Sequence, residues 1–465
     1  MKAVYLLVIA CYVALLWATG FLVTRRSRSS DAYLLASRSL SVPLVSVLVA
    51  GTWIGGVSVV GMAQGAYIHG VSALWFQAGV WIAMFVTALL LHKIVEGKKT
   101  YSILDIVGGL YGRKTGQTAG LLQLVFSVWV VTMQIVGGGA ILSFIMKGQV
   151  SFAQGMLLTA VVFTLYNVAG GFVATAYTNL IHIAAIILGI FLGGLYVIVN
   201  SDALGQMATR GHYFSPFGDM GIFQALGWTL INFTLGVLAQ PIINTASSAA
   251  SLKQGRIGIV IGNLIAIPVV VMAALCGIAA KHMFPDVPSL SALPALLDVV
   301  PPYVGVLFLL AMWAPLMSSG SPFLMGATTL AVKGYVVPLL RIENDRSVLL
   351  ASRLTTLAIG LVAFLLGFFV KEILRETTWL AVFLSAIVYI VASGWAGRRI
   401  SSIYALISLL GTVVIVFLSF VSGFYRVVHP VWPVTGFVFM VMVIGCLASK
   451  WTIQKEGVRE TPYGQ

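Results

Sequence analysis

Three glycines interrupt an apolar stretch that is otherwise long enough to cross a bilayer. The stretch runs from Val45 to Gly70, and Gly51, Gly55 and Gly56 lie near its middle. Each glycine weakens a helix by roughly 1 kcal/mol relative to alanine, so this cluster predicts an interrupted helix. Carbonyl groups freed at such a break can coordinate a cation, and the half-helix ends present oriented dipoles. The stretch therefore predicts a binding site at membrane depth rather than an anchor.

A second group of oxygen-bearing residues lies in the apolar stretch 302–332. Pro315 has no N–H, which leaves the Ala311 carbonyl without its helical partner, so we expect that turn to loosen. Ser318 and Ser319 place hydroxyl groups one turn further on. Carbonyl and hydroxyl oxygens suit a hard cation such as Na⁺. The alternative is that the serine pair only lets two membrane helices pack closely, and residue types alone do not decide between the two.

Titratable groups are scarce where a membrane carrier would need them. None of the 13 acidic residues falls near the middle of a predicted span, although proton-coupled carriers usually keep a carboxylate there. A driving ion would therefore be held by neutral oxygens. His182 is the lone histidine predicted inside the membrane, near the inner end of its helix. It is either a hydrogen-bonded packing residue or part of a proton relay.

Composition places the chain among all-α polytopic membrane proteins. The 465 residues are 60% hydrophobic and 9% charged, and the mean hydropathy is +1.02. We predict 13 transmembrane helices from the apolar runs. The predicted spans are 3–23, 41–68, 71–92, 119–146, 150–170, 172–199, 222–246, 257–280, 302–332, 347–370, 378–396, 400–421 and 431–449. The segments 101–116 and 290–299 are predicted to be short helices in loops, and the polar tail 450–465 to be disordered.

Lys and Arg residues are distributed unevenly between the predicted loops on the two sides of the membrane. Of the 27 Lys and Arg residues, 20 fall on one side of the membrane and seven on the other. Because Lys and Arg collect in the cytoplasm, the N-terminus is predicted outside and the C-terminus inside. The net charge of +14 is therefore a consequence of topology, and no nucleic-acid partner is expected. The three cysteines are too few and too distant for a disulfide framework or metal cluster.

Three motifs occur in order along the chain. Residues 31–40 read DAYLLASRSL, residues 170–172 read GGF, residues 176–182 read AYTNLIH, and residues 317–319 read MSS. Together they resemble the entry motif, the G-G-F…T-D…Q signature and the serine pair of the sodium:solute symporter family. The resemblance covers most of the chain with matching spacing.

The resemblance implies a fold of two five-helix units related by inverted topology. It also implies a multi-pass protein of the plasma (inner) membrane, in contact with lipid. Both units would open with an interrupted segment, the glycine-rich one in the first and Gln240-Pro241 in the second. The implied divisions are 1–24 as an extra N-terminal helix, 41–199 as the first repeat, 222–396 as the second, 400–449 as two peripheral helices and 450–465 as a cytoplasmic tail.

The family resemblance also implies a sodium site made of neutral oxygens. The backbone carbonyls of Gly51, Ile54 and Pro315 would coordinate Na⁺, and the hydroxyls of Ser318 and Ser319 would complete the site. Na⁺ is then the coupling ion.

The alignment with the family motifs also gives candidate substrate contacts and two positions where this chain differs from the family. Trp53, Ser58 and Gln77 fall where family members contact substrate, although Gln77 fits a helix–helix hydrogen bond equally well. Asn179 stands where the family usually has Asp, and His182 where it usually has Gln. Because that Asp is thought to help sodium leave, these two residues bear on gating and coupling.

The identity of the solute stays open at this point. Residues 52–56 resemble the choline-transporting branch, in which aromatic faces cage a quaternary ammonium. Five tryptophans are candidates for such a cage, although tryptophans also gather at membrane interfaces as anchors. They are Trp53, Trp75, Trp81, Trp228 and Trp379. A neutral or zwitterionic solute and an organic anion are the other possibilities.

The sequence predicts a secondary active transporter rather than an enzyme. It would import a small polar organic solute by alternating access, using the sodium gradient. The alternatives are a solute-sensing membrane protein, or a family member with weakened or non-sodium coupling. The sequence makes no prediction of oligomeric state.

Overall fold

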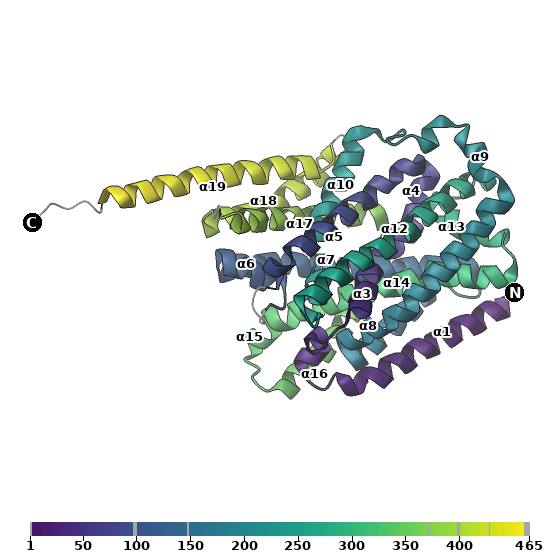
Figure 1. Cartoon of the computed structure of the whole chain (residues 1–465), viewed down its shortest axis with the longest axis horizontal. Helices are drawn as coiled ribbons and strands as arrows, with labels where there is room; N and C mark the ends of the chain where they lie inside the picture. The colour runs from purple at the N-terminus through teal and green to yellow at the C-terminus, as the bar shows by residue number, and fades with distance from the viewer. Residues whose placement is uncertain are drawn as a thin grey trace, which may run out of the picture.

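The computed structural model describes residues 2–95, 100–146, 148–370, 373–397, 400–426 and 428–459, and these residues form an all-helical bundle (Figure 1). The α-helices are α1 (Lys2–Val23), α2 (Ser30–Leu35), α3 (Val42–Trp53), α4 (Met62–His69), α5 (Trp75–Ile94), α6 (Ile103–Tyr111), α7 (Arg113–Met146), α8 (Phe152–Ser201), α9 (Ala203–Ala208), α10 (Gly221–Val237), α11 (Gln240–Ser248), α12 (Leu252–Met283), α13 (Ala292–Ala295), α14 (Pro302–Ala331), α15 (Val337–Leu340), α16 (Asp345–Leu366), α17 (Ile373–Trp395), α18 (Ser402–Val421) and α19 (Val431–Arg459).

Ten helical stretches among the described residues are long and apolar enough to cross a membrane, against 13 predicted spans. The difference has three sources. Residues 57–94 and 152–201 are each continuous stretches that contain two predicted spans or parts of them, and 379–395 is a shorter apolar helix. The predicted short helices in loops are present as α6 and as the helical turns from Ser289 to Asp298.

The long helix α8 changes direction at Gly171, where the sequence predicted a boundary between two spans. Gly171 has φ +58° and ψ −143°, a backbone conformation that favours glycine because it has no Cβ. A Cβ at this position would lie 2.4 Å from the Tyr33 carbonyl oxygen. The glycine therefore both turns the chain and admits the backbone of α2.

The predicted interruption in the glycine-rich segment is present. Helix α3 ends at Trp53, and a π-helical turn, η3 (Val57–Gly61), begins only after Ile54–Gly56. A second break separates α10, which ends at Val237, from α11, which begins at Gln240. Pro241 is the second residue of α11, where its missing N–H costs nothing.

The prediction that Pro315 loosens its helix is wrong. Helix α14 is continuous from Pro302 to Ala331, with Pro315 and Pro322 inside it. Proline removes one hydrogen bond, and the tight packing of α14 against α8 and α7 holds the remaining turns in place. From Phe308 to Leu330 every residue of α14 is buried, so this helix forms the centre of the bundle.

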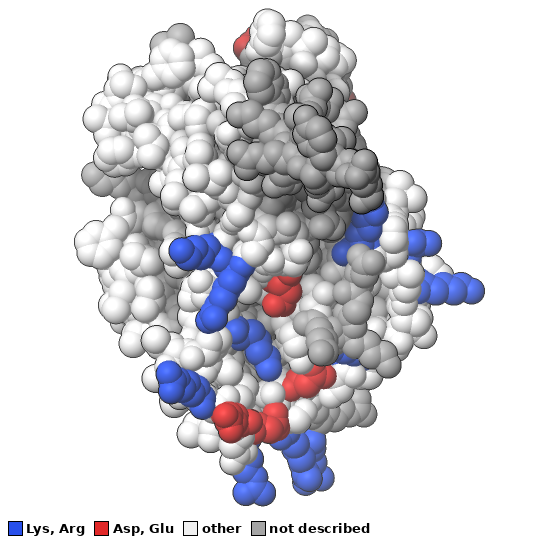
Figure 2. Space-filling view, turned by 90° about the vertical axis from the view of Figure 1, so that its left-hand side faces the viewer, with Lys and Arg blue, Asp and Glu red and all other residues white. Residues whose placement is uncertain are grey.

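One end of the molecule carries a projecting helix and a group of basic side chains. In Figure 1, α19 projects from the bundle beyond α6 and α15, toward the C-terminus. It continues as a helix to Arg459, where the sequence predicted a disordered tail; residues 460–465 lie outside the described residues. Figure 2 views this end of the molecule and shows Lys and Arg side chains gathered there. That gathering is what the positive-inside pattern expects of a cytoplasmic face.

Candidate functional site

Three carbonyl groups at the broken end of α3 and one carbonyl group of α14 meet two hydroxyl groups of α14. The Ser318 Oγ lies 3.4 Å from the Gly51 carbonyl oxygen, 3.1 Å from that of Ile54 and 3.0 Å from that of Pro315. The Ser319 Oγ donates to the Thr52 carbonyl at 2.9 Å. We call these six oxygens the oxygen cluster. All five residues predicted for the sodium site contribute an oxygen to this cluster.

The broken helix supplies these carbonyls for a simple reason. The last carbonyl groups of a helix have no intrahelical partner, and they carry the negative end of the helix dipole. Because α3 stops at Trp53, the carbonyls of Gly51 and Thr52 are released inside the bundle, while that of Ala50 still accepts the Ile54 N–H. Sequence analysis did not select Thr52, because its carbonyl group is released only if the helix ends at Trp53, and the sequence does not define that end residue.

The oxygen cluster holds more acceptors than donors. Ser318 has a single hydroxyl proton, and three carbonyl oxygens converge on its Oγ, so two of them are left without that donor. A small cation would neutralise this excess, and neutral carbonyl and hydroxyl oxygens are suitable ligands for it. The donor set therefore fits Na⁺. No carboxylate lies among the described residues of the cluster.

Asn179 of α8 lies against the same end of α3. Its side chain is fully buried, and neither its Oδ1 nor its Nδ2 has a hydrogen-bond partner among the described residues. A Cβ built on Gly51 would lie 2.8 Å from the Oδ1 and 2.9 Å from the Nδ2 of Asn179. A buried amide without partners costs about 1–3 kcal/mol, so this side chain is placed for a partner beyond those of the bundle.

The contact between Gly51 and Asn179 makes Gly51→Ala a sharp test of the cluster. The added methyl group would lie within 3.0 Å of the Asn179 amide, so either that side chain or the end of α3 must shift, and we expect sodium-induced thermal stabilisation of the purified protein to be lost. Gly436→Ala in α19 is the matched control, because a Cβ there meets no atom within 4 Å. Equal sodium stabilisation in both variants would show that the end of α3 holds no sodium.

His182 lies one turn beyond Asn179 on α8 and is fully buried. One ring nitrogen bonds the Tyr12 hydroxyl of α1 at 2.5 Å, and the other lies 3.3 Å from the Tyr166 hydroxyl. The Tyr166 hydroxyl also bonds Ser321 of α14. Both ring nitrogens therefore have hydroxyl partners, so His182 is a hydrogen-bonded residue of the bundle interior.

The residues predicted to contact substrate surround a small cavity beside the oxygen cluster, which we call the inner cavity. Its volume is about 60 Å³, and Trp53, Ser58 and Gln77 all line it, together with Thr52 and Ser319. The Ser58 hydroxyl donates to the Gln77 Oε1 at 3.2 Å. The Gln77 Nε2 is buried and has no hydrogen-bond partner in the part of the chain that the structure describes, and the whole residue is 1% exposed. Gln77 thus offers an unused donor at the cavity wall.

The five candidate tryptophans do not form a cage. Only Trp53 lines the inner cavity, and its indole N–H points to the Met84 sulfur at 3.1 Å. Trp75 donates to the Pro216 carbonyl and stacks on Phe217, away from the cavity. The other aromatic walls are phenylalanines, which sequence analysis could not select because apolar residues of this type fill every span. They are Phe76, Phe126 and Phe323.

Two amides were missed in the sequence, Gln134 of α7 and Asn232 of α10, and both line the inner cavity. The Gln134 Oε1 accepts the Gly56 N–H at 3.0 Å, which satisfies a free donor at the break after α3. Each amide interrupts an otherwise apolar run. A polar side chain inside a membrane span costs free energy and therefore usually marks a functional position. That signal was available in the sequence.

Comparisons with known proteins agree with this fold. The profile of the sodium:solute symporter family matches residues 33–411. The high affinity choline transporter 1 of Homo sapiens is 22% identical over 392 residues, covering 79% of this chain and 67% of that protein. The sodium/pantothenate symporter of Escherichia coli is 24% identical over 388 residues, covering 77% of both.

Solved structures show the same fold at low identity. A Na⁺-coupled sialic acid symporter in a substrate-bound, outward-open state superposes with a TM-score of 0.83 at 14% identity, covering 96% of this chain and 97% of that one. Mhp1, a nucleobase-cation-symport-1 family transporter, gives 0.62 at 13% identity, covering 91% and 95%. The helical bundle of this chain therefore has the fold of these two transporters. The chain belongs to the sodium:solute symporter family.

Proposed function

We propose that this protein imports a small polar organic solute by alternating access, driven by the sodium gradient. The observation that carries the proposal is the convergence of the Ser318 and Ser319 hydroxyls on free carbonyls at the break of α3. The relatives named for choline and pantothenate support solute transport as the activity. In this account Na⁺ is the coupling ion, and the chain is not an enzyme.

The placement of the two sites explains how sodium and solute help each other to bind. Thr52 and Ser319 belong to the oxygen cluster and also line the inner cavity. Sodium bound in the cluster ties α3 to α14 and so fixes one wall of the cavity before the solute arrives. Each ligand then raises the affinity for the other by an equal factor.

The architecture we propose is the five-plus-five inverted repeat with 13 transmembrane helices. The two repeats, 41–199 and 222–396, would each begin with a broken helix, and breaks lie at 54–56 and 238–239. The gathering of basic side chains around the α6 and α15 end supports a cytoplasmic face there and an external N-terminus.

Weakened sodium coupling is a second candidate, and Asn179 favours it. The family motif usually has Asp at this position, and the amide here carries no charge beside the oxygen cluster. Uptake would then continue with little dependence on sodium.

Counterflow into proteoliposomes separates these possibilities. A thermal-shift panel of amines, amino acids, sugars and short acids, each with and without Na⁺, first selects the solute that stabilises the purified protein. We expect counterflow of that solute to rise with external Na⁺. Counterflow that is indifferent to Na⁺ supports weakened coupling, and solute binding without any flux supports a sensor.

Gln77→Leu tests the inner cavity as the solute site. The variant keeps the side-chain volume and removes the unpartnered donor, so the solute loses one hydrogen bond and KM for uptake should rise about tenfold. Gln117→Leu, at the end of α7 remote from the cavity, is the control and should leave KM unchanged. An unchanged KM in Gln77→Leu would support the helix–helix role instead.

A further inference from the structure

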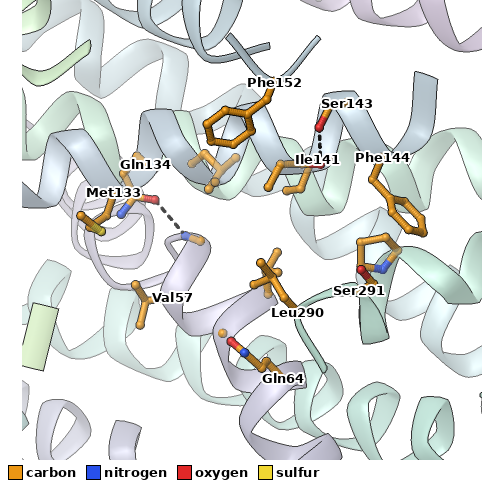
Figure 3. Close-up of a pocket in the computed structure, with 17 residues that line it drawn as sticks. Val57, Gln64, Met133, Gln134, Ile141, Ser143, Phe144, Phe152, Leu290 and Ser291 are labelled. Atoms are coloured by element: carbon orange, nitrogen blue, oxygen red, sulfur yellow. Dashed lines mark hydrogen bonds between the residues drawn. The ribbon is translucent and has the colours of Figure 1, made fainter. Parts of the chain in front are cut away.

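A second and larger cavity (Figure 3) lies next to the inner one, and Gln134 lines both. We call it the outer cavity. Its volume is about 380 Å³, within the range of roughly 300–1,000 Å³ that is typical of small-molecule sites. Its walls come from η3 and α4, from α7, and from the segment that includes Leu290 and Ser291. In Figure 3, Phe152, Leu290 and Gln134 lie around the same open space.

The lining of the outer cavity is amphipathic and carries no charged side chain among the residues described. Phe144 and Phe152 supply aromatic surface, and Gln64, Gln134 and Ser291 supply polar groups. An ion that left water for these walls would find no opposite charge, and burial without one is costly. An uncharged molecule with polar and apolar parts would bury its apolar surface and keep partners for its polar atoms.

The wall between the two cavities is thin. Val57 and Gln134 line both of them, and the hydrogen bond from the Gly56 N–H to the Gln134 Oε1 holds the wall in place. The inner cavity has room for about two water molecules at ~30 Å³ each. A solute of several heavy atoms therefore fits the outer cavity as it stands, and reaches the inner one only after the wall moves.

We propose that the outer cavity is a second solute-binding position, that it selects uncharged, partly apolar solutes, and that Gln134 is the latch between it and the inner cavity. The inference rests on the proposed transport function. It narrows the solute to one class among the cation, neutral molecule and anion that the sequence left open. Releasing the latch exchanges one hydrogen bond for another, because an acceptor oxygen of the solute replaces the Gln134 Oε1 at the Gly56 N–H.

Cysteine modification tests the selectivity without any need for uptake. Ala140, which lines the outer cavity, is replaced by Cys in a background without Cys11, Cys276 and Cys446. Purified protein is treated with methanethiosulfonates of similar size that carry a hydroxyethyl, a trimethylammonium-ethyl or a sulfonatoethyl group. Gln149→Cys, exposed beyond the same end of α7, gives the intrinsic reactivity of each reagent.

After normalisation to Gln149→Cys, we expect the neutral reagent to modify Ala140→Cys at least about tenfold faster than either charged reagent. Equal normalised rates, a faster charged reagent or no reaction at all would overturn the assignment of solute class. Because the rates do not depend on transport, these results stand apart from success or failure of the sodium-driven uptake experiment.

The latch is tested by a reporter in the inner cavity. Ser58→Cys, behind the wall, should react with the neutral reagent slowly, and at least about tenfold faster when Gln134→Leu is added. Gln134→Ala removes the same hydrogen bond and serves if the leucine variant does not fold, while Gln117→Leu is the control. An unchanged rate in a folded Gln134 variant would show that Gln134 is no latch.

Discussion

Replacing both Ser318 and Ser319 by alanine should abolish sodium-stimulated uptake. In the proposed site each hydroxyl is a ligand of Na⁺, and a hydrogen-bonding group that faces a charge contributes about 1.5–3 kcal/mol, so losing two should lower sodium affinity by about a hundredfold or more. The measurement is initial uptake into proteoliposomes over a range of external Na⁺ concentrations.

The control for this double variant is Ser408→Ala/Thr412→Ala in the peripheral helix α18. Those two hydroxyls bond carbonyls of their own helix, at 2.9 and 2.8 Å, so the same groups are removed without touching the oxygen cluster. The control should keep its sodium response. A normal sodium response in Ser318→Ala/Ser319→Ala would mean that the serine pair serves only close packing of helices.

Asn179→Asp should have the second largest effect, in the opposite direction. A carboxylate at this position would lie beside the end of α3 and attract a cation in the oxygen cluster. At an effective dielectric constant of about 20 and a separation of ~5 Å the attraction is about 3 kcal/mol, part of which is spent on burying the charge. We expect the sodium concentration for half-maximal uptake to fall about tenfold.

Asn200→Asp is the matched control, since it makes the same change at the exposed end of the same helix. It should leave the sodium response unchanged. If Asn179→Asp folds and shows the sodium response of the unaltered protein, then this position has no part in coupling.

Much of the fold was predictable because lipid imposes strong rules on sequence. Every backbone polar group must be satisfied inside the bilayer, so long apolar runs become helices and clustered glycines mark where one breaks. The break after Trp53 and the turn at Gly171 both follow from glycine. The glycine cluster and the serine pair are local features of the sequence, but their meeting in one oxygen cluster was implied by the family resemblance.

The remaining features depend on packing, which local patterns do not reveal. Pro315 would weaken an isolated helix, but α14 is enclosed on all sides and stays continuous. Gln134 and the phenylalanines around the inner cavity come from helices far apart in sequence, and only the packed bundle brings them together. Trp75, Trp228 and Trp379 lie near the ends of predicted spans, a position that fits interface anchors, and none of them lines the inner cavity.

Equilibrium binding of ²²Na⁺ to the purified protein tests the central claim most directly, because it requires neither a solute nor flux. The oxygen cluster predicts saturable binding that is lost in Ser318→Ala/Ser319→Ala and kept in Ser408→Ala/Thr412→Ala. Saturable binding of equal strength in both double variants would contradict the placement of sodium between α3 and α14.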